Sequence, residues 1–428
     1  MHTLQQQITR YAALVVGQGI NLQPGQSLAI KAEIGHRAFV RELVGAAYAA
    51  GARYVEVDWI DPLLQKERLD KSQPEFLDYL PDNLTVQASD RLAEGWAAIS
   101  VVGKEFPHLM DGADAEGLRR MQTAYYQKLE VWRAAVMRNQ VAWCVCATPT
   151  PDWAAQVFPG LDGEAAVEAL WRAILASAHV TAHVTENVTE NGNGWADHIR
   201  RLEGVAGFLN SRPIDSLHFF DPAPGPDGKP STDLTLGLTA QPHWISGSSP
   251  TTGGVIFSPN IPTEEAFVTP HRQRADGWTR SSKPFFPFEQ EVTGAWFRFE
   301  DGAVVAYGAE KGEAMLDQFF GVEGCRRLGE VALVDAGSPI FQSGLLFYNT
   351  LYDENAAIHL AFGRGYAIGI NGGGEMEAEE LDELGLNLSA LHLDTMIGTE
   401  TMSVTARYTD GSEVTIMREG RYTKTVKS

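Results

Sequence analysis

The chain has 428 residues, 44% of them hydrophobic and 21% charged, which is the composition of a folded globular protein and excludes a disordered one. This length exceeds what one hydrophobic core usually organises, so we expect two domains. The formal net charge of −21 argues against nucleic acid and membrane surfaces as partners, because a negative protein repels phosphate groups. A negative field instead favours cations, including the ammonium group of a peptide N-terminus.

Cysteine usage and hydropathy indicate a cytoplasmic address. Cys144, Cys146 and Cys325 are too few for a disulfide framework, and the C-x-C lacks the second pair of a structural zinc site, so we expect buried thiols. The N-terminus has no cationic region followed by a continuous apolar core, and no window reaches the roughly 18 apolar residues of a membrane helix.

The first half of the chain alternates helix-like and strand-like segments. Amphipathic or strongly helical patterns cover residues 3–19, 37–51, 113–137 and 164–178, and strand-like patterns cover 27–34, 53–60, 92–106 and 140–151. Such alternation predicts an α/β domain with a mostly parallel sheet over residues 1–190. Neither a G-x-G-x-x-G nor a Walker motif occurs at a strand-to-helix junction, which disfavours a nucleotide-binding enzyme.

The texture changes after about residue 183. One more helix-like segment, 195–210, and a turn-rich stretch are followed by short strands separated by turn residues, among them 234–241, 294–302, 303–312, 327–335, 403–410 and 412–420. We therefore predict a β-rich α+β domain over residues 191–428. This second domain holds the side chains that carry chemistry.

Those side chains form an ordered set of metal-capable groups. Two imidazoles and three carboxylates on separate segments are suitable ligands for a pair of divalent ions. The set consists of Glu264 in NIPTEEAF, Glu330 in RLGEVALV, His359 in AAIHLAFG, and His392 with Asp394 in LHLD.

Each member also has an alternative without metal. Glu264 and Glu265 fit solvated acids at a helix start, and Glu330 fits an ion pair with Arg326 or Arg327 or an outward-facing position. Burial favours the metal for Glu330, because an apolar strand makes an unpaired carboxylate costly.

The two histidine segments have alternatives of the same kind. A lone histidine such as His359 is commonly a satisfied core residue. The neighbouring Asp353, Glu354 and Asn355 could orient its ring, and Asp353 or Glu354 could instead bind a substrate amine. His392 and Asp394 would project to one face if LHLD is a strand.

Longer strings carry a resemblance to a known family. NIPTEEAFVTPHRQRADG, EGCRRLGEVALVD, FYNTLYDENAAIHLAFGRGY and HLDTMIG look like signatures of the aminopeptidase T-like metallopeptidases, in that family's order. VWRAAVMRNQVAWCVCATPTPDWAAQVFP is similar to the family too, so the resemblance spans nearly the whole chain.

The resemblance implies a function and a site. It implies an aminopeptidase with two divalent ions, zinc or cobalt before manganese or magnesium, bound by Glu264, Glu330, His359, His392 and Asp394. Glu330 would bridge the ions, Tyr366 would be an active-site tyrosine, and Glu265 is our candidate general base.

The resemblance also implies the partners. It implies an N-terminal α/β domain, a C-terminal catalytic domain, and a homodimer with enclosed sites that admit short peptides. Another metallohydrolase activity, such as amidase or esterase, and a non-catalytic peptide-binding relative are the alternatives. Arg272 and Arg274 would either anchor carboxylates of the site or pair with surface acids.

Overall fold

The computed structural model describes residues 2–180, 194–226 and 228–427. The chain divides into two compact units, one of Met1–Trp195 with Ser248–Pro262 and one of Ala196–Gly247 with Thr263–Ser428. The boundary that we predicted after residue 190 lies outside the described residues. Residues 248–262 also belong to the first unit, which our prediction of a single boundary did not include.

The first unit is built on a five-stranded parallel sheet, as its α/β pattern predicts. Its order is β10-β4-β3-β1-β2, with β1 Ser27–Glu33, β2 Tyr54–Ile60, β3 Ala97–Val102, β4 Trp143–Ala147 and β10 Asn260–Ile261. The last strand comes from the returning segment, which also forms the small β8–β9 hairpin (Ser249–Pro250, Ile256–Phe257).

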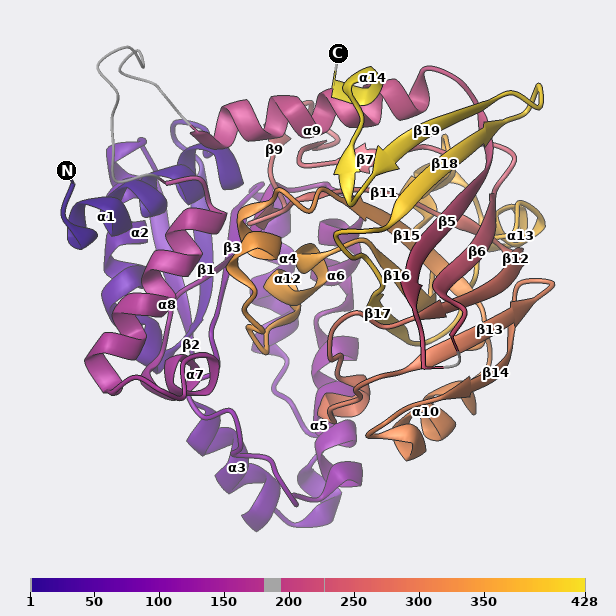
Figure 1. Cartoon of the computed structure of the whole chain (residues 1–428). Coiled ribbons are helices and arrows are strands. Elements are labelled where there is room, and N and C mark those ends of the chain that lie inside the picture. Colours follow the sequence, from indigo (N-terminus) through magenta and orange to yellow (C-terminus); the bar gives the residue numbers. More distant parts are fainter. Residues whose placement is uncertain (1, 181–193, 227, 428) are drawn as a thin grey trace. The chain divides into compact units, whose positions relative to one another are not determined.

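Helices of the first unit connect and cover this sheet. They are α1 Leu4–Leu14, α2 Arg37–Ala49, α3 Pro62–Lys71, α4 Asn83–Ala93, α5 Ala115–Lys128, α6 Glu130–Met137, α7 Pro151–Val157 and α8 Gly163–Ser177. Helices α1, α2 and α8 lie side by side, joined by ring contacts among Tyr11, Phe39 and Trp171 (Figure 1). Cys144 and Cys146 are free and buried in β4, as expected.

The second unit contains two antiparallel sheets, which confirms the predicted β-rich domain (Figure 1). The larger has eight strands in the order β14-β13-β12-β6-β5-β18-β19-β20. Their bounds are β5 Ile214–Pro224, β6 Pro230–Leu238, β12 Pro270–Arg280, β13 Trp296–Glu300, β14 Ala303–Gly308, β18 Ser403–Tyr408, β19 Glu413–Arg418 and β20 Arg421–Tyr422.

The smaller sheet has five strands in the order β17-β16-β15-β11-β7. Their bounds are β7 Ile245–Ser246, β11 Glu265–Val268, β15 Leu328–Val334, β16 His359–Gly363 and β17 His392–Met396. The helices of this unit are α9 Gly194–Asn210, α10 Glu313–Phe320, α11 Pro339–Ser343, α12 Thr350–Asp353, α13 Ala378–Glu383 and α14 Lys424–Lys427.

One face of the smaller sheet packs on the larger sheet to form the core of the second unit. Phe362 of β16 contacts Phe297 and Phe299 of β13, with ring centroids 4.8 and 6.0 Å apart. The same face contributes Ala266, Val268, Val331, Leu333 and Leu360 to this core. Each large apolar side chain buried there stabilises the fold by about 2 kcal/mol. This stabilisation determines which face of the smaller sheet is buried.

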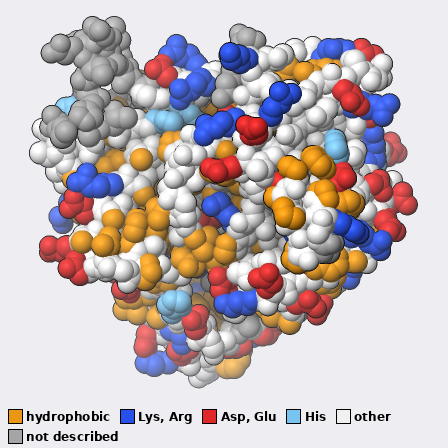
Figure 2. All heavy atoms as spheres, in the orientation of Figure 1, with side chains coloured by type: hydrophobic (Ala, Val, Ile, Leu, Met, Phe, Trp, Pro, Cys, Tyr) orange, Lys and Arg blue, Asp and Glu red, His pale blue; other side chains and the backbone are white. Residues whose placement is uncertain are grey.

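Acidic and basic side chains lie interspersed on the face of the molecule shown in Figure 2. None of the described helices is both long and apolar enough to cross a membrane.

A bulge in β15 determines which way Glu330 points. Leu328 pairs with Phe362 whereas Glu330 pairs with Ala361, so the register shifts by one residue at Gly329. Leu328 therefore faces the core and Glu330 faces the opposite side. A Cβ on Gly329 would lie 2.4 Å from the carbonyl oxygens of Arg364 and Gly363, so only glycine fits there.

We predict that Gly329→Ala lowers the free energy of unfolding by about 3 kcal/mol, because a close backbone contact must open or the bulge must be lost. Chemical denaturation measures this change. Gly204→Ala is the control, since Gly204 is exposed on α9 with nothing within 4 Å of an added Cβ. It should raise the stability by up to about 1 kcal/mol. Equal stability of Gly329→Ala and the wild type would contradict the role of the bulge.

Candidate metal centre

Five ionisable side chains of the second unit lie on one face of the five-stranded sheet: Glu265, Glu330, His359, His392 and Asp394. Cross-strand partners share a face, and the registers pair Ala332 with both Phe267 and His359, and Ala361 with both Glu330 and Asp394. His392 pairs with Gly363, which puts it on the same face two residues before Asp394. This face is opposite to the one packed in the core, so the apolar packing aims all of these side chains the same way.

Glu330 lies at the centre of the group. Its Oε1 is 3.7 Å from Nε2 of His359, and its Oε2 is 3.9 Å from Nε2 of His392. Its side chain is 7% exposed, and neither Arg326 nor Arg327 pairs with it among the described residues. A single buried carboxylate thus presents one oxygen to each of two imidazoles.

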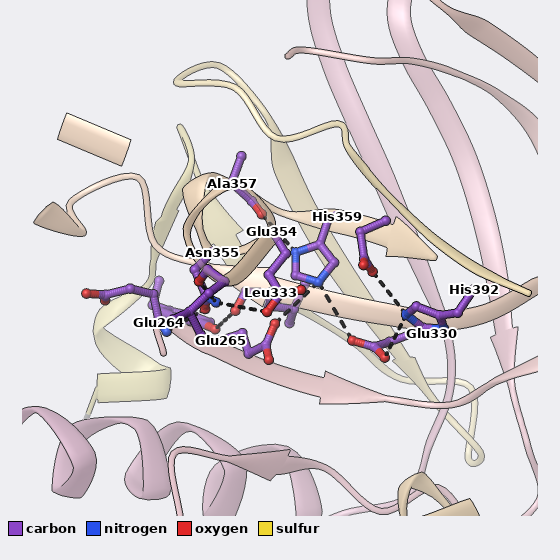
Figure 3. A network of polar contacts seen from close by, with 12 residues as sticks. Glu264, Glu265, Glu330, Leu333, Glu354, Asn355, Ala357, His359 and His392 are labelled. Atoms are coloured by element: carbon purple, nitrogen blue, oxygen red, sulfur yellow. Dashed lines mark hydrogen bonds and ion pairs between the residues drawn. The ribbon is translucent and has the colours of Figure 1, made fainter. Parts of the chain in front are cut away.

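Glu265 completes one side of the group and Asp394 the other. Oε2 of Glu265 lies 3.3 Å from Nε2 of His359, and Oδ1 of Asp394 lies 3.2 Å from Nε2 of His392. In the part of the chain that the structure describes, the buried Oε2 of Glu265 has no hydrogen-bond partner. Glu265, Glu330 and His359 offer atoms that all lie within 4.8 Å of one another (Figure 3).

Both imidazoles are oriented by backbone carbonyls. Nδ1 of His359 donates to the carbonyl of Ala357 at 3.2 Å, and Nδ1 of His392 donates to the carbonyl of Arg364 at 2.7 Å. Each ring therefore directs its Nε2 at the carboxylates. This is the usual arrangement of a ligating histidine, whose second nitrogen is held by a hydrogen bond.

Glu264, which we expected to be a ligand, lies on the other face of the sheet. The segment is not a helix start: β11 begins at Glu265, and successive side chains of an extended chain alternate. The carboxylate of Glu264 lies 3.7 Å from Nε2 of the buried His198 and points away from the cluster (Figure 3). Glu265 therefore lies in the cluster around Glu330, whereas Glu264 lies outside that cluster.

Glu354 joins the cluster, and its neighbour Asp353 does not. Burial, followed by the negative charges of Asp394 and Glu265, raises the pKa of Glu354 well above its usual value. Asp353 instead accepts hydrogen bonds from the backbone N–H groups of Phe347 and Asn349 at 2.7 and 2.8 Å, so it organises its own loop. The position of Glu354 five residues before His359 was the sequence signal, but it did not distinguish the two acids.

Tyr366 borders the cluster beside His392. The two ring centroids are 5.1 Å apart, and the ring of Phe267 packs edge-on at 6.2 Å. Burial, followed by the charges of Glu330 and Asp394, raises the pKa of Tyr366, so the phenol keeps its proton. A protonated phenol can donate a hydrogen bond to an oxygen that gains negative charge.

Arg272 and Arg274 are paired outside the cluster. Arg272 forms an ion pair with Asp382 and donates to the carbonyl of Leu386 at 2.8 Å. Arg274 pairs with Asp215 at 2.8 Å. Both arginines therefore pair with acids at the surface, which is the second of the two alternatives given above.

The cluster has the electrostatics of a cation site. Burial raises the pKa of Glu330 despite the nearby imidazole of His359. Burial by itself lowers the pKa of His359, but Glu265 and Glu330 raise it well above its usual value. Without metal, the carboxylates thus draw protons onto the imidazoles.

The donor set fits divalent metal ions. Four carboxylates and two imidazoles converge there, so two divalent cations would neutralise the site. The cross-strand neighbours of His359 and Glu330 on this face are Ala332 and Ala361, whose side chains are small. Oε2 of Glu265, which accepts no hydrogen bond from the described residues, lies 3.3 Å from the imidazole nitrogen of His359, so both atoms could bind a common ion.

Comparison with known proteins finds similar chains along nearly the whole length of this one. The family model described as thermophilic metalloprotease (M29) matches residues 4–422. The chain is 38% identical to aminopeptidase T of Thermus aquaticus and 36% identical to aminopeptidase AmpS of Bacillus subtilis, in each case over 99% of this chain and 100% of the relative. The solved structure of wild-type AmpT from Thermus thermophilus superposes with a TM-score of 0.88 at 37% identity, covering 98% of this chain and 100% of that one.

Proposed function

The chain belongs to the thermophilic metalloprotease family M29, and we propose that it removes N-terminal residues from oligopeptides with the help of two divalent metal ions. The named relatives are aminopeptidases, which makes this chain a metal-dependent aminopeptidase. The number of ions, their ligands and the size of the substrate are the parts that we infer.

The observation that carries the proposal is the position of Glu330 between two imidazoles. Its oxygens lie 3.7 Å from Nε2 of His359 and 3.9 Å from Nε2 of His392, so it would be shared by two ions. Glu265 and His359 would hold one ion, and His392 and Asp394 the other. Mixed nitrogen and oxygen donors favour zinc or cobalt, with manganese or magnesium as alternatives.

Glu354 supplies the fourth carboxylate of this set. In the part of the chain that the structure describes, its carboxylate forms no ion pair with His359 or His392. It is therefore the member best able to accept a proton from water and return it to the leaving amine, in addition to any bond to an ion. Glu264 cannot take this role, and Glu265 moves from our candidate base to the ligand set.

Two divalent ions bound in such a site acidify water and polarise the scissile carbonyl. The sheet fixes the positions of the carboxylates and imidazoles that would bind the ions. Tyr366 would donate a hydrogen bond to the oxyanion of the tetrahedral intermediate. The excess of negative charge on the protein favours a substrate that carries an ammonium group.

Three further properties accompany the proposal. The homodimer with enclosed sites follows from the family resemblance and implies short peptides as substrates. A cytoplasmic address is supported by the free, buried cysteines. Amidase or esterase activity, and peptide binding without catalysis, are the alternatives that the assays below distinguish.

The adjacent acids Glu264 and Glu265 provide the sharpest test of the site. Glu265→Gln should lose one bound ion and at least about 100-fold in the chelator-sensitive release of the N-terminal residue from a short peptide. Glu264→Gln should keep both ions and most of the activity, because burial raises the pKa of Glu264 to about 7 and a neutral amide suits the same place. Metal content by mass spectrometry and peptide hydrolysis measure both effects.

The reverse pattern, with an ion lost only in Glu264→Gln, would refute our assignment of Glu265 rather than Glu264 as the ligand. Hydrolysis that persists after complete metal removal would refute the mechanism. Cleavage of esters or simple amides without cleavage of peptides would favour the alternative hydrolase, and metal binding without any hydrolysis would favour the binding protein.

Metal affinity should depend on pH through His392. Burial by itself lowers the pKa of this imidazole, but in the metal-free protein Asp394 and Glu330 raise it to about 9. A ligating imidazole must be neutral, so affinity for Co²⁺ should rise by up to about tenfold per pH unit below about pH 9. Calorimetry in two buffers of different ionisation enthalpy counts the protons released, and an affinity independent of pH would contradict the assignment.

The stability of the metal-free protein should change with the opposite sign. A pKa above the unfolded value of about 6.5 means that protonated His392 stabilises the folded state. This contribution is fully present below about pH 6.5 and is lost as the pH rises through about 9. Chemical denaturation of the metal-free protein at these two pH values measures the loss, and His392→Gln should remove it.

Tyr366→Phe should lower kcat by about 100-fold, since one donor to the oxyanion is lost. KM should change by less than about threefold, and metal content should be unchanged. Steady-state kinetics measure both constants. Tyr307→Phe is the control, because that hydroxyl donates to Asp317 on the surface. An unchanged kcat in Tyr366→Phe would remove the phenol from the mechanism.

A further inference from the structure

The peptide bond that joins Thr263 to Glu264 is held by side chains on both of its polar groups. Nε2 of His198 donates to the carbonyl oxygen of Thr263 at 2.7 Å. Oδ1 of Asn355 accepts from the N–H of Glu264 at 2.7 Å. These two atoms belong to the same peptide plane, and the next residue is Glu265. The plane is therefore fixed from two directions directly before the metal-capable carboxylate.

Both holding side chains are buried and have defined orientations. His198 is 4% exposed on α9, and since a carbonyl only accepts, its Nε2 must carry the proton. Asn355 is fully buried, and its Nδ2 donates to the carbonyl of Leu351 at 3.1 Å. The same Nδ2 lies 3.5 Å from Oε1 of Glu354. Asn355 thus links the turn that carries Glu354 to the segment that carries Glu265.

The sheet alone does not orient this segment. The pairing of β11 with β15 begins at Glu265, opposite Val334, and Thr263 and Glu264 precede the ladder. A residue at the end of a strand keeps rotational freedom that its interior neighbours lose. Without the two side chains, the peptide plane could rotate, and the carboxylate of Glu265 would move with its backbone.

We propose that His198 and Asn355 are positioning residues that set the place of Glu265, and through it the affinity of the ion shared with His359. The inference rests on the proposed role of Glu265 as a ligand. Both side chains act through the peptide bond between Thr263 and Glu264, so neither needs to touch the ion. Losing either bond also leaves a buried backbone group without its partner, which favours a rotated peptide.

The test compares His198→Leu with His198→Gln. Leucine removes the donor, whereas Nε2 of glutamine occupies nearly the place of the imidazole Nε2 and can donate to the same carbonyl. We expect His198→Leu to weaken the binding of one of the two Zn²⁺ ions by about 10- to 100-fold, and His198→Gln to stay within about threefold of the wild type. Zn²⁺ titration of the full-length metal-free protein gives the two affinities.

Asn355→Ala is the second arm, since it removes the acceptor from the other side of the same peptide. It should weaken the same ion, and the absorption spectrum of the Co²⁺-loaded protein should change in the same way as in His198→Leu. Thr232→Val controls for loss of stability alone: it breaks the buried hydrogen bond between the hydroxyls of Thr232 and Thr279 in the larger sheet. This variant should leave both affinities and the Co²⁺ spectrum unchanged.

The outcomes separate this inference from the proposed function. If Glu265→Gln loses an ion while His198→Leu and Asn355→Ala bind both normally, the positioning role is overturned and the metal centre stands. If Glu265→Gln keeps both ions, the proposed centre itself fails. If His198→Leu does not fold, His198→Gln still provides the test, because glutamine keeps the donor. A loss of Zn²⁺ affinity in His198→Gln as large as that in Asn355→Ala would overturn the role of the donated hydrogen bond.

Discussion

The packing of one face of the five-stranded sheet against the larger sheet is the constraint on which the rest of the second unit depends. Apolar residues of β11, β15 and β16, among them Leu333 and Phe362, are buried between the sheets. Because strand side chains alternate, this packing directs every second residue to the opposite side. A shift of one residue would bury the carboxylates in the apolar core, so the register that stabilises the fold also assembles the site.

The assembled site is electrostatically unfavourable without bound cations. Glu265, Glu330, Glu354 and Asp394 converge in a largely buried space. Burial, followed by the negative charges of Glu265 and Asp394, raises the pKa of Glu330. Burial by itself lowers the pKa of His359, but Glu265 and Glu330 raise it well above its usual value. An evolved core would exclude such a group unless an ion compensated it. In the function that we propose, the same concentration of charge that opposes folding of the metal-free chain would supply ligands and proton acceptors for hydrolysis. Stability and function therefore meet in one set of side chains.

Much of the fold could be predicted from sequence because the signals were local. The alternation of helix and strand patterns in the first half predicted the parallel sheet. The strands within 294–312, 327–335 and 403–420 were predicted from apolar runs separated by turn residues. The strand β12 and the return of residues 248–262 to the first unit were not predicted, since the first has a polar pattern and the second depends on a distant partner, β4. Of the site, the predicted segments lie together in the structure, and Glu265 rather than Glu264 is the acid of its segment that faces Glu330.

That choice shows what the sequence by itself determined and what only the tertiary structure decided. Residue type and strand pattern determined that His392 and Asp394 share a face, since a period of two is a property of the extended chain itself. Which face of β11 is turned inward was decided by its partners: Ala266 packs in the core, so Glu265 faces Glu330 while Glu264 faces His198. The bulge at Gly329 is of the same kind, because a close approach between distant backbones leaves no mark in the sequence beyond a glycine. Local periodicity defines the two faces of a strand, and only long-range packing selects the one that becomes the site.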